Sequence, residues 1–487
     1  MTDTSIRFLL NNDVKSVADY NPNTSLLQYL RDSEAKCGTK EGCASGDCGA
    51  CTVAVAELES PTGTALRYKS VNACISLLPS LHGKQVLTVE DLKQGDQLHG
   101  CQQAMVDCHA SQCGFCTPGF VMSLFALQKN HAAPSREQIL EALAGNLCRC
   151  TGYNTILDAA KQQFAKQPPE DQFDRNRDHT IRELQALNTV ASTQQGDSQH
   201  QAYSPASLEE LAELLARHPN AKLLAGGTDL ALAITQQLQA FDTLIYVGAI
   251  PELVHTRDTA DTVSIGAALP YCDFSPRLSA DYPELGAMIE RLGSLQIRNQ
   301  GTLGGNIGNA SPIGDMPPVL IALGATMTLR QGDQTRSLAV QDFFIDYKVT
   351  ALRQGEFIQS IEIPKPRANH VLKVYKISKR LDDDISAVLG VFHLSIVKGK
   401  IETAQLAFGG MAAIPKRAQH CEAALRGQSW NQSTIDSATR ALESDFSPLS
   451  DARASADYRM QVAKNLLQKC FLEIENPGVQ TNVAHFS

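Results

Sequence analysis

The stretch Cys43-Ala44-Ser45-Gly46-Asp47-Cys48-Gly49-Ala50-Cys51, followed later by Cys74, decides the fold of the first part of the chain. Its spacing is C-x4-C-x2-C with a fourth, more distant cysteine, which is the pattern of thiolates that hold a [2Fe–2S] cluster. Glycines beside and between the cysteines permit the positive φ angles that a tight ligand loop needs. We therefore predict a cluster on Cys43, Cys48, Cys51 and Cys74, and we interpret Cys37, which is out of register, as a non-ligand.

The residues around this loop predict a small β-grasp ferredoxin domain over residues 1–88. Ile6–Leu10 has the composition of a strand that enters a hairpin turn, with residues 15–18 as its partner. Residues 25–30 predict a short helix, and residues 52–56, directly after the ligand loop, predict another strand. Strand, strand, helix, cysteine loop and strand is the order of elements that such a domain requires.

A second set of cysteines follows, with Cys113 and Cys116 in a C-x2-C motif and Cys148 and Cys150 in a C-x-C motif. Four thiolates can hold an iron–sulfur cluster, and a tetrahedral zinc site is the alternative that spacing alone leaves open. Helical patterns surround both motifs, so we expect a four-helix bundle over residues 89–165. Its expected helices cover residues 96–109, the stretch after Thr117-Pro118, the stretch after Ser135, and residues 155–167.

Length and composition limit the class of protein. A chain of 487 residues with 43% hydrophobic residues predicts several globular domains. The net charge of −9 argues against nucleic acid or an anionic membrane as the main partner. No apolar run reaches the length of a membrane span, and the first residues lack the features of a secretory signal, so we expect a cytoplasmic protein. Eleven of the fourteen cysteines lie between Cys37 and Cys150, a clustering that favours metal ligation over disulfides.

The second half of the chain opens after a polar stretch, residues 166–200, that we interpret as a solvated and partly ordered connector between domains. Residues 222–225 predict a buried strand that ends in the turn Gly226-Gly227-Thr228-Asp229. Residues 298–310 contain four glycines and several short polar side chains. Both stretches could surround a diphosphate with backbone N–H groups. The chain has no G-x-G triplet, so a flavin would need a fold other than the Rossmann fold.

The motifs Gln112-Cys113-Gly114-Phe115-Cys116-Thr117-Pro118-Gly119 and Gly145-Asn146-Leu147-Cys148-Arg149-Cys150-Thr151-Gly152-Tyr153, together with the first loop, resemble the xanthine dehydrogenase/aldehyde oxidase family. The resemblance implies a multidomain α+β chain with two [2Fe–2S] clusters. It also implies a non-Rossmann FAD-binding domain over residues 201–375 and a C-terminal α+β flavoprotein subdomain over residues 376–487. In this family the second cluster lies nearest the molybdenum cofactor, and the glutamine that corresponds to Gln112 contacts the pterin.

By the same resemblance, two stretches and three single residues would bind FAD. They are Lys222, Leu223, Leu224, Ala225, Gly226, Gly227, Thr228, Asp229, Leu230, Thr302, Leu303, Gly304, Gly305, Asn306, Ile307, Asp315, Ile358 and Lys376. Tyr347 and Asp383 match positions on the NAD side of the flavin. Leu292 stands where animal members of the family carry a phenylalanine near the flavin ring.

The resemblance implies the small, electron-transferring subunit of a bacterial two-subunit xanthine dehydrogenase. Purine would be oxidised at molybdenum on a large partner subunit, in an assembly of two small and two large subunits. Electrons would pass through the two clusters to FAD and then to NAD+, so we expect no acid or base catalyst in this chain. The alternatives are a related hydroxylase of aldehydes or aromatic substrates and, from another class, an iron–sulfur redox sensor.

Overall fold

The chain folds into two units, each assembled from several stretches of sequence. The computed structural model describes residues 2–60, 62–165, 169–189, 192–479 and 481. The first unit consists of Met1–Glu252, Pro270–Cys272 and Gly293–Thr302. The second unit consists of Leu253–Leu269, Asp273–Leu292 and Leu303–Ser487.

The first unit begins with a five-stranded mixed sheet that has the predicted β-grasp arrangement. Its strands, in spatial order, are β3 (Asp13–Val17), β2 (Ile6–Leu10), β6 (Gln85–Leu87), β4 (Thr52–Leu58) and β5 (Leu66–Asn72). Only β2 and β6 are parallel. Helix α1 (Leu26–Gln28) is capped by Ser25 and continues into the π-helical turn η1 (Tyr29–Ser33). Apolar side chains of β2, such as Phe8, share one hydrophobic core with those of this helix, such as Leu26.

Four helices follow, as the sequence predicts. They are α2 (Gly100–Asp107), α3 (Thr117–Asn130), α4 (Arg136–Ala144) and α5 (Asn154–Phe164), preceded by the 3₁₀ turns η2 (Leu78–Leu81) and η3 (Val89–Leu92). Helix α3 is buried along most of its length and packs against β4 and β5. This helix begins slightly earlier than expected, because Thr117 and Pro118 are its first two residues and Cys116 holds the N-cap position. The predicted end of the last helix, residues 166–167, lies outside the described residues.

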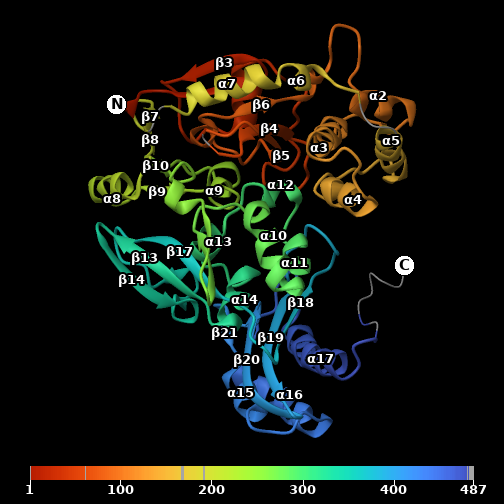
Figure 1. Ribbon diagram of the computed structural model, residues 1–487, viewed down its shortest axis with the longest axis vertical. Helices are drawn as coiled ribbons and strands as arrows, with labels where there is room; N and C mark the ends of the chain where they lie inside the picture. Colours follow the sequence, from red (N-terminus) through yellow and green to blue (C-terminus); the bar gives the residue numbers. More distant parts are fainter. Residues whose placement is uncertain (1, 61, 166–168, 190–191, 480, 482–487) are drawn as a thin grey trace. The chain divides into compact units, whose positions relative to one another are not determined.

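The polar stretch at residues 166–200 is more ordered than its composition indicates. Within its described residues it forms α6 (Gln172–Arg175), α7 (Arg177–Leu187) and the strand β7 (Ser192–Gly196). Helix α7 lies across the ferredoxin sheet, where Leu184 and Leu187 pack on Leu9 (Figure 1). Strand β7 needs no apolar side chains, because its backbone pairs with two neighbouring strands. Residues 166–168 and 190–191 lie outside the described residues.

Strand β7 belongs to a second sheet of the first unit. Its order is β1 (Thr2–Asp3), β7, β8 (Gln201–Ser204), β10 (Thr243–Tyr246) and β9 (Lys222–Leu224). Helices α8 (Leu208–Arg217), α9 (Leu230–Thr235) and α12 (Leu295–Arg298) complete the unit. Strand β9 was expected to be buried, but it lies at the edge of this sheet, and Lys222 and Leu223 are exposed.

The second unit contains two larger sheets and a hairpin. One antiparallel sheet has the order β11 (Thr256–Asp258), β12 (Thr262–Gly266), β17 (Phe357–Pro364), β13 (Thr326–Gln331) and β14 (Gln334–Ala339). The hairpin consists of β15 (Phe344–Asp346) and β16 (Val349–Thr350). The other sheet has the order β18 (His370–Ile377), β19 (Val388–Val397), β20 (Lys400–Gly409) and β21 (Lys416–Arg417).

Helices surround these sheets and complete the expected α+β architecture. They are α10 (Tyr271–Asp281), whose first two residues belong to the first unit, α11 (Pro283–Glu290), α13 (Leu303–Gly308), α14 (Met316–Leu323), α15 (Gln419–Leu425), α16 (Gln432–Asp445) and α17 (Ala456–Glu475). The 3₁₀ turns η4 (Pro251–Leu253) and η5 (Val340–Asp342) connect strands. Among the described residues, no helix is long and apolar enough to cross a membrane.

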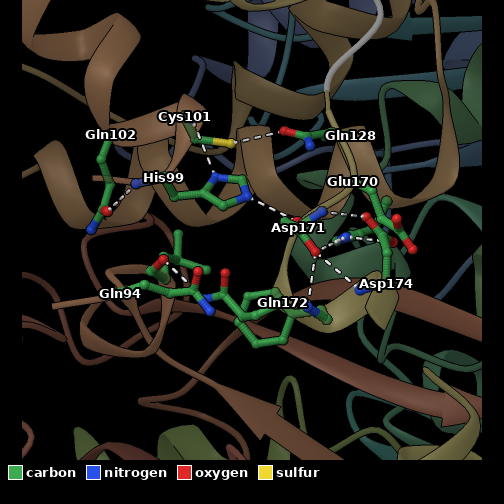
Figure 2. A network of polar contacts seen from close by, with 12 residues as sticks. Gln94, His99, Cys101, Gln102, Gln128, Glu170, Asp171, Gln172 and Asp174 are labelled. Carbon is green, nitrogen blue, oxygen red and sulfur yellow. Dashed lines mark hydrogen bonds and ion pairs between the residues drawn. The ribbon is translucent and has the colours of Figure 1, made fainter. Parts of the chain in front are cut away.

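A buried polar network fastens α6 to the helical bundle (Figure 2). The Asp171 carboxylate accepts a hydrogen bond from His99 Nε2 at 2.9 Å and pairs with Lys129 Nζ at 2.6 Å. His99 Nδ1 accepts the Cys101 N–H, which leaves Nε2 as the protonated nitrogen. Burial alone would raise the pKa of Asp171, but the hydrogen bonds from His99 and Lys129 hold it well below its usual range.

Removing the Asp171 charge should loosen this region. We expect Asp171→Asn to remove the buried carboxylate that pairs with Lys129 and to leave Lys129 only its bond to the exposed Asp174 at 2.7 Å, at a cost of about 3 kcal/mol to local stability. Hydrogen exchange in α2 and α3 would then accelerate roughly a hundredfold. Because the pKa of Asp171 is depressed, its contribution is present at neutral pH and is lost as the pH falls below about 4. Hydrogen exchange in Asp171→Asn should therefore lack the acceleration that protonation of Asp171 causes below about pH 4.

The exposed carboxylate of Asp96 offers a matched control, since it makes only a loose pair with Lys93 at 3.8 Å. Asp96→Asn should leave the exchange of α2 and α3 unchanged. Equal acceleration in the two variants would contradict the role given to Asp171.

Candidate redox site

The four cysteines of the first set meet beside the start of β4. Cys51 directly precedes this strand, and Cys74 follows β5. The thiol of Cys43 is in hydrogen-bonding contact with the thiols of Cys48 and Cys74, and Cys74 also contacts Cys51. Cys51 and Cys74 are buried, whereas Cys43 and Cys48 are half-buried. The structure thus brings together all four cysteines of the first predicted set.

Backbone amides of the loop surround one of these sulfur atoms. Cys43 Sγ accepts N–H groups from Ser45 at 3.4 Å, Asp47 at 3.3 Å and Cys48 at 3.4 Å. Contacts with the Cys48 and Cys74 thiols, together with the Ser45 N–H, hold the pKa of Cys43 well below its usual range. An electropositive lining of this kind favours a thiolate ligand over a thiol.

The second set lies at helix ends, as predicted. Cys116 occupies the N-cap position of α3, and Cys148 and Cys150 follow α4. The Cys150 and Cys113 sulfurs are 3.7 Å apart, and Cys116 is in hydrogen-bonding contact with Cys148. In the described part of the chain, no three His, Cys, Asp or Glu side chains form a group suited to one metal ion. The thiols of this set instead meet in two pairs, which suits a two-iron cluster whose irons each take two thiolates.

Exposure divides the second set into an inner and an outer pair. Cys116 and Cys148 are half-buried, whereas Cys113 and Cys150 are exposed. Gln112, the expected pterin contact, is exposed beside them. Leu147 and Tyr153 add exposed apolar surface to the same loop. The outer edge of this set is therefore open to solvent in the isolated chain.

A backbone hydrogen bond joins the two cysteine sets. The N–H of Leu147, the residue before Cys148, donates to the Cys48 carbonyl at 3.0 Å. Next to it, the Asn146 amide donates to the Gly49 carbonyl at 3.0 Å. Cys48 of the first set and Cys148 of the second set are thus separated by one residue, Leu147, and one hydrogen bond.

The glycine turn after β9 lies close to the first cysteine set. A β-carbon added to Gly227 (φ +72°) would lie 3.2 Å from the carbonyl oxygen of Ile75, the residue after Cys74. One added to Gly226 would lie 1.9 Å from the Gln300 carbonyl oxygen. After α9, the Gln236 amide donates to the Cys43 and Ala44 carbonyls at 3.0 Å each. Within the first unit, the expected FAD turn therefore runs beside the cluster loop.

Most residues expected at the flavin diphosphate lie in partly open positions. In the turn, Ala225, Gly226, Gly227, Thr228 and Leu230 are half-buried and Asp229 is exposed, whereas Leu224 is buried in the core. Thr302 is buried and forms an isolated bridge with Pro270.

The second unit contributes the other glycine stretch, which forms the short helix α13. Gly304 packs against Ala267, where an added β-carbon would lie 2.5 Å from the alanine β-carbon. Gly305 is exposed, and Leu303 and Ile307 point into the core. The Asn306 Oδ1 atom is buried with no hydrogen-bond partner among the described residues. A ligand hydroxyl or N–H group would satisfy this acceptor, so the residues present fit a bound flavin.

A buried ion pair lies elsewhere in the second unit. Lys376 Nζ on β18 is 2.6 Å from Asp315 Oδ2, and the Ser386 hydroxyl donates to Asp315 Oδ1 at 2.5 Å. Asp315 precedes α14, and both charged side chains are less than one-tenth exposed. Ile358, also buried, lies on β17 opposite Leu329. Two of the four charged residues expected at FAD, Asp315 and Lys376, thus pair with each other.

The residues expected on the NAD side are found in exposed turns. Tyr347 is 59% exposed between β15 and β16. Asp383 has φ +47° in the loop after β18. Leu292 is half-buried after α11.

One residue that the sequence did not indicate, Arg291, anchors the loop after β18. Its guanidinium donates to the Leu381 carbonyl at 2.9 Å, the Lys376 carbonyl at 3.0 Å and the Ser378 hydroxyl at 3.3 Å. Burial lowers the pKa of Arg291, and the Asp382 and Asp315 charges oppose this effect. A lone arginine after a helix carries no spacing signal, so only the fold could identify it.

Four known domain families match the chain along most of its length. Residues 10–78 match the 2Fe-2S iron-sulfur cluster binding domain, and residues 88–161 match a [2Fe-2S] binding domain. Residues 198–366 match the FAD binding domain in molybdopterin dehydrogenase, and residues 373–474 match the CO dehydrogenase flavoprotein C-terminal domain.

Curated relatives include two xanthine dehydrogenases. The enzyme of Emericella nidulans is 32% identical over 91% of this chain and 36% of its own length. The xanthine dehydrogenase/oxidase of Rattus norvegicus is 30% identical over 97% of this chain and 39% of its own length. The chain thus spans less than two-fifths of these relatives.

Solved structures with the same fold include carbon monoxide dehydrogenase from Hydrogenophaga pseudoflava (TM-score 0.53) and quinoline 2-oxidoreductase from Pseudomonas putida 86 (TM-score 0.52). Each is 28% identical, and each match covers 55% of this chain and 94% of the solved chain. The chain is therefore an iron–sulfur and flavin-binding region of the molybdenum hydroxylases, related to the N-terminal part of xanthine dehydrogenase.

Proposed function

We propose that this chain is the electron-transfer subunit of a molybdenum hydroxylase of the xanthine dehydrogenase type. The observation that carries the proposal is the sequence of contacts within the first unit. The second cysteine set is hydrogen-bonded through Leu147 to Cys48 of the first set, and the first set lies beside Gly227 of the expected FAD turn. This arrangement supports electron flow from the second cluster to the first and then to FAD.

The chain's own groups would bind and insulate the cofactors. When bound, the clusters carry single electrons and FAD delivers them as the hydride that NAD+ requires. Cys43, Cys48, Cys51 and Cys74 would hold the first cluster, and Cys113, Cys116, Cys148 and Cys150 would hold the second. The loop amides on Cys43 would stabilise the negative charge on sulfur, and the buried positions of Cys51 and Cys74 would exclude water.

For FAD, the turn after β9 offers backbone N–H groups, and Asn306 Oδ1 offers an unsatisfied acceptor. Lys376 and Asp315 would present one fixed charge pair to the flavin rather than two independent contacts. Tyr347 and Asp383 would face the nicotinamide, and Arg291 would keep the loop that carries Asp383 in place.

The exposed edge of the second set supports a partner that carries the molybdenum cofactor. Cys113 and Cys150 are open to solvent beside the apolar side chains of Leu147 and Tyr153. A protein surface that covered this edge would shorten the electron path and exclude water. Gln112 would then reach the pterin of a separate large subunit, in an assembly of two small and two large subunits.

Purine oxidation is the favoured reaction, because both curated relatives described above are named xanthine dehydrogenase. The related structures are a carbon monoxide dehydrogenase and a quinoline oxidoreductase, so another small or aromatic substrate is the second candidate. A redox sensor without turnover would have no use for the two flavoprotein domains that the chain matches.

The isolated chain should contain about four irons and one FAD, as two four-thiolate sets predict. Cys48→Ser should remove one of two [2Fe–2S] signals in the EPR spectrum of the reduced protein. Cys37→Ser is the matched control, because Cys37 is an exposed cysteine of the same region outside the set, and it should retain both signals. Zinc in place of iron, or two signals in Cys48→Ser, would contradict the ligand assignment.

Lys376→Met should destabilise the second unit by about 3–5 kcal/mol, because it leaves the buried Asp315 carboxylate unpaired. Flavin content and the midpoint of thermal unfolding measure the effect. Lys379 bonds only the exposed Ala452 carbonyl among the hydrogen bonds described, so Lys379→Met is the control. The double variant Asp315→Asn/Lys376→Met should recover part of the loss, and stability equal to that of the single variant would argue against the pair.

NADH should reduce the flavin of the purified chain under anaerobic conditions, with loss of flavin absorbance and then appearance of reduced clusters. With the large subunit added, xanthine should drive the same bleaching, whereas aldehydes or quinolines should not. Reduction by dithionite but not by NADH would indicate a different electron acceptor. Bleaching by aldehydes or quinolines alone would select the second candidate.

A further inference from the structure

The sulfur of Cys148 accepts three hydrogen bonds from the loop that follows it. The Cys150 N–H and the Thr151 N–H each lie 3.4 Å from Cys148 Sγ, and the Thr151 hydroxyl lies 3.2 Å from it. Two of the donors are backbone N–H groups, and the third exists only because residue 151 carries a side-chain hydroxyl.

The structure also determines where the Thr151 hydroxyl hydrogen points. The Tyr153 N–H donates to Thr151 Oγ1 at 3.2 Å, so the oxygen already acts as an acceptor on that side. Its hydrogen is left for the sulfur of Cys148. The Ser45 hydroxyl beside Cys43 differs, because it donates to the Asp47 carboxylate at 2.6 Å.

The backbone around Thr151 is held in an uncommon conformation. Tyr153 has φ +70°, a left-handed conformation that costs energy for a bulky residue. Its phenolic oxygen accepts the Cys148 N–H at 2.9 Å, so Tyr153 bonds both ends of the loop. The side chain and the backbone of Tyr153 together fix Thr151 against the sulfur.

Hydrogen bonds to sulfur are among the features that set the reduction potential of an iron–sulfur cluster. Reduction adds one electron and one negative charge, and a donor aimed at a ligand sulfur stabilises the more negative state. We propose that the Thr151 hydroxyl raises the reduction potential of the second cluster and so sets how readily it accepts an electron from the partner. The electron enters without a bond being formed or broken in the protein, and the proton stays on Thr151. The inference rests on the proposed function, because it requires a cluster on this cysteine set.

The test is a potentiometric titration of the cofactor-loaded chain, followed by EPR. The second cluster is identified as the signal lost in Cys113→Ser. In Thr151→Val, the ratio of reduced to oxidised second cluster at a fixed potential should fall about tenfold, which is 59 mV for a one-electron couple. The first cluster should not shift and serves as the internal reference.

Two control variants separate the hydroxyl from the shape of the loop. Thr151→Ser keeps the donor and should stay within about twofold of the unmodified chain. Thr155→Val makes the same substitution four residues later, where the buried hydroxyl has no partner among the described residues, and should also leave the potential unchanged. Thr151→Ala also removes the hydroxyl and should therefore reproduce the shift in potential expected for Thr151→Val.

Each outcome decides the question. An unchanged potential in Thr151→Val with both clusters present overturns the inference and leaves the proposed function intact. An equal shift in Thr155→Val, or in both clusters, also overturns it. If neither Thr151→Val nor Thr151→Ala assembles the second cluster, Thr151 retains the cluster rather than tuning it, and the inference is wrong. An unmodified chain without two distinguishable clusters would contradict the proposed function itself.

Discussion

The close approach of the two cysteine sets depends on three glycine backbones that are in direct contact. A β-carbon on Gly49 would lie 2.2 Å from the Gly145 carbonyl oxygen, and one on Gly119 would lie 2.2 Å from the Gly49 carbonyl oxygen. The ligand loop of the ferredoxin domain therefore fits between the start of α3 and the end of α4 only when Gly49 and Gly119 lack side chains. This approach brings the Leu147 N–H within bonding distance of Cys48.

The same contact extends to a segment from the flavin half of the sequence. A β-carbon on Gly145 would lie 2.3 Å from the Ser294 β-carbon. Next in the chain, the Gln296 amide donates to the Thr52 and Ser123 hydroxyls, and Asn299 donates to the Ser70 carbonyl. Buried amides with satisfied partners specify one arrangement, because every alternative leaves them unpaired. Helix α12 and the adjoining Asn299 thus bond to both cysteine-binding domains through buried amide N–H donors.

Local spacing predicted the cysteine sets and the helices well, because ligand loops and capping boxes are determined within a few residues. Ser135 with Gln138 at the start of α4 is an example. Spacing failed where distant backbone decides the structure. Strand β7 has a uniformly polar sequence and owes its order to its neighbours, whereas Leu223, which was expected in a buried strand, lies on an exposed edge. The pairing of Lys376 with Asp315 joins residues 61 positions apart, and no local pattern could indicate it. The roles of the FAD and NAD-side residues stay predictions, because binding depends on the cofactors as well as on the residues of the chain.

The discontinuous make-up of the first unit has a consequence for biosynthesis. The ribosome completes residue 252 well before it reaches residues 293–302, which the unit needs for its buried amides. At about 5–20 residues per second, the delay is roughly 3–10 seconds. During that interval the Gly145 surface lacks its contact with Ser294, and the Ser70 carbonyl lacks its hydrogen bond from Asn299. Insertion of iron and sulfide before translation passes Asn299 would act on an unfinished scaffold, so the order of synthesis itself favours late loading of both clusters.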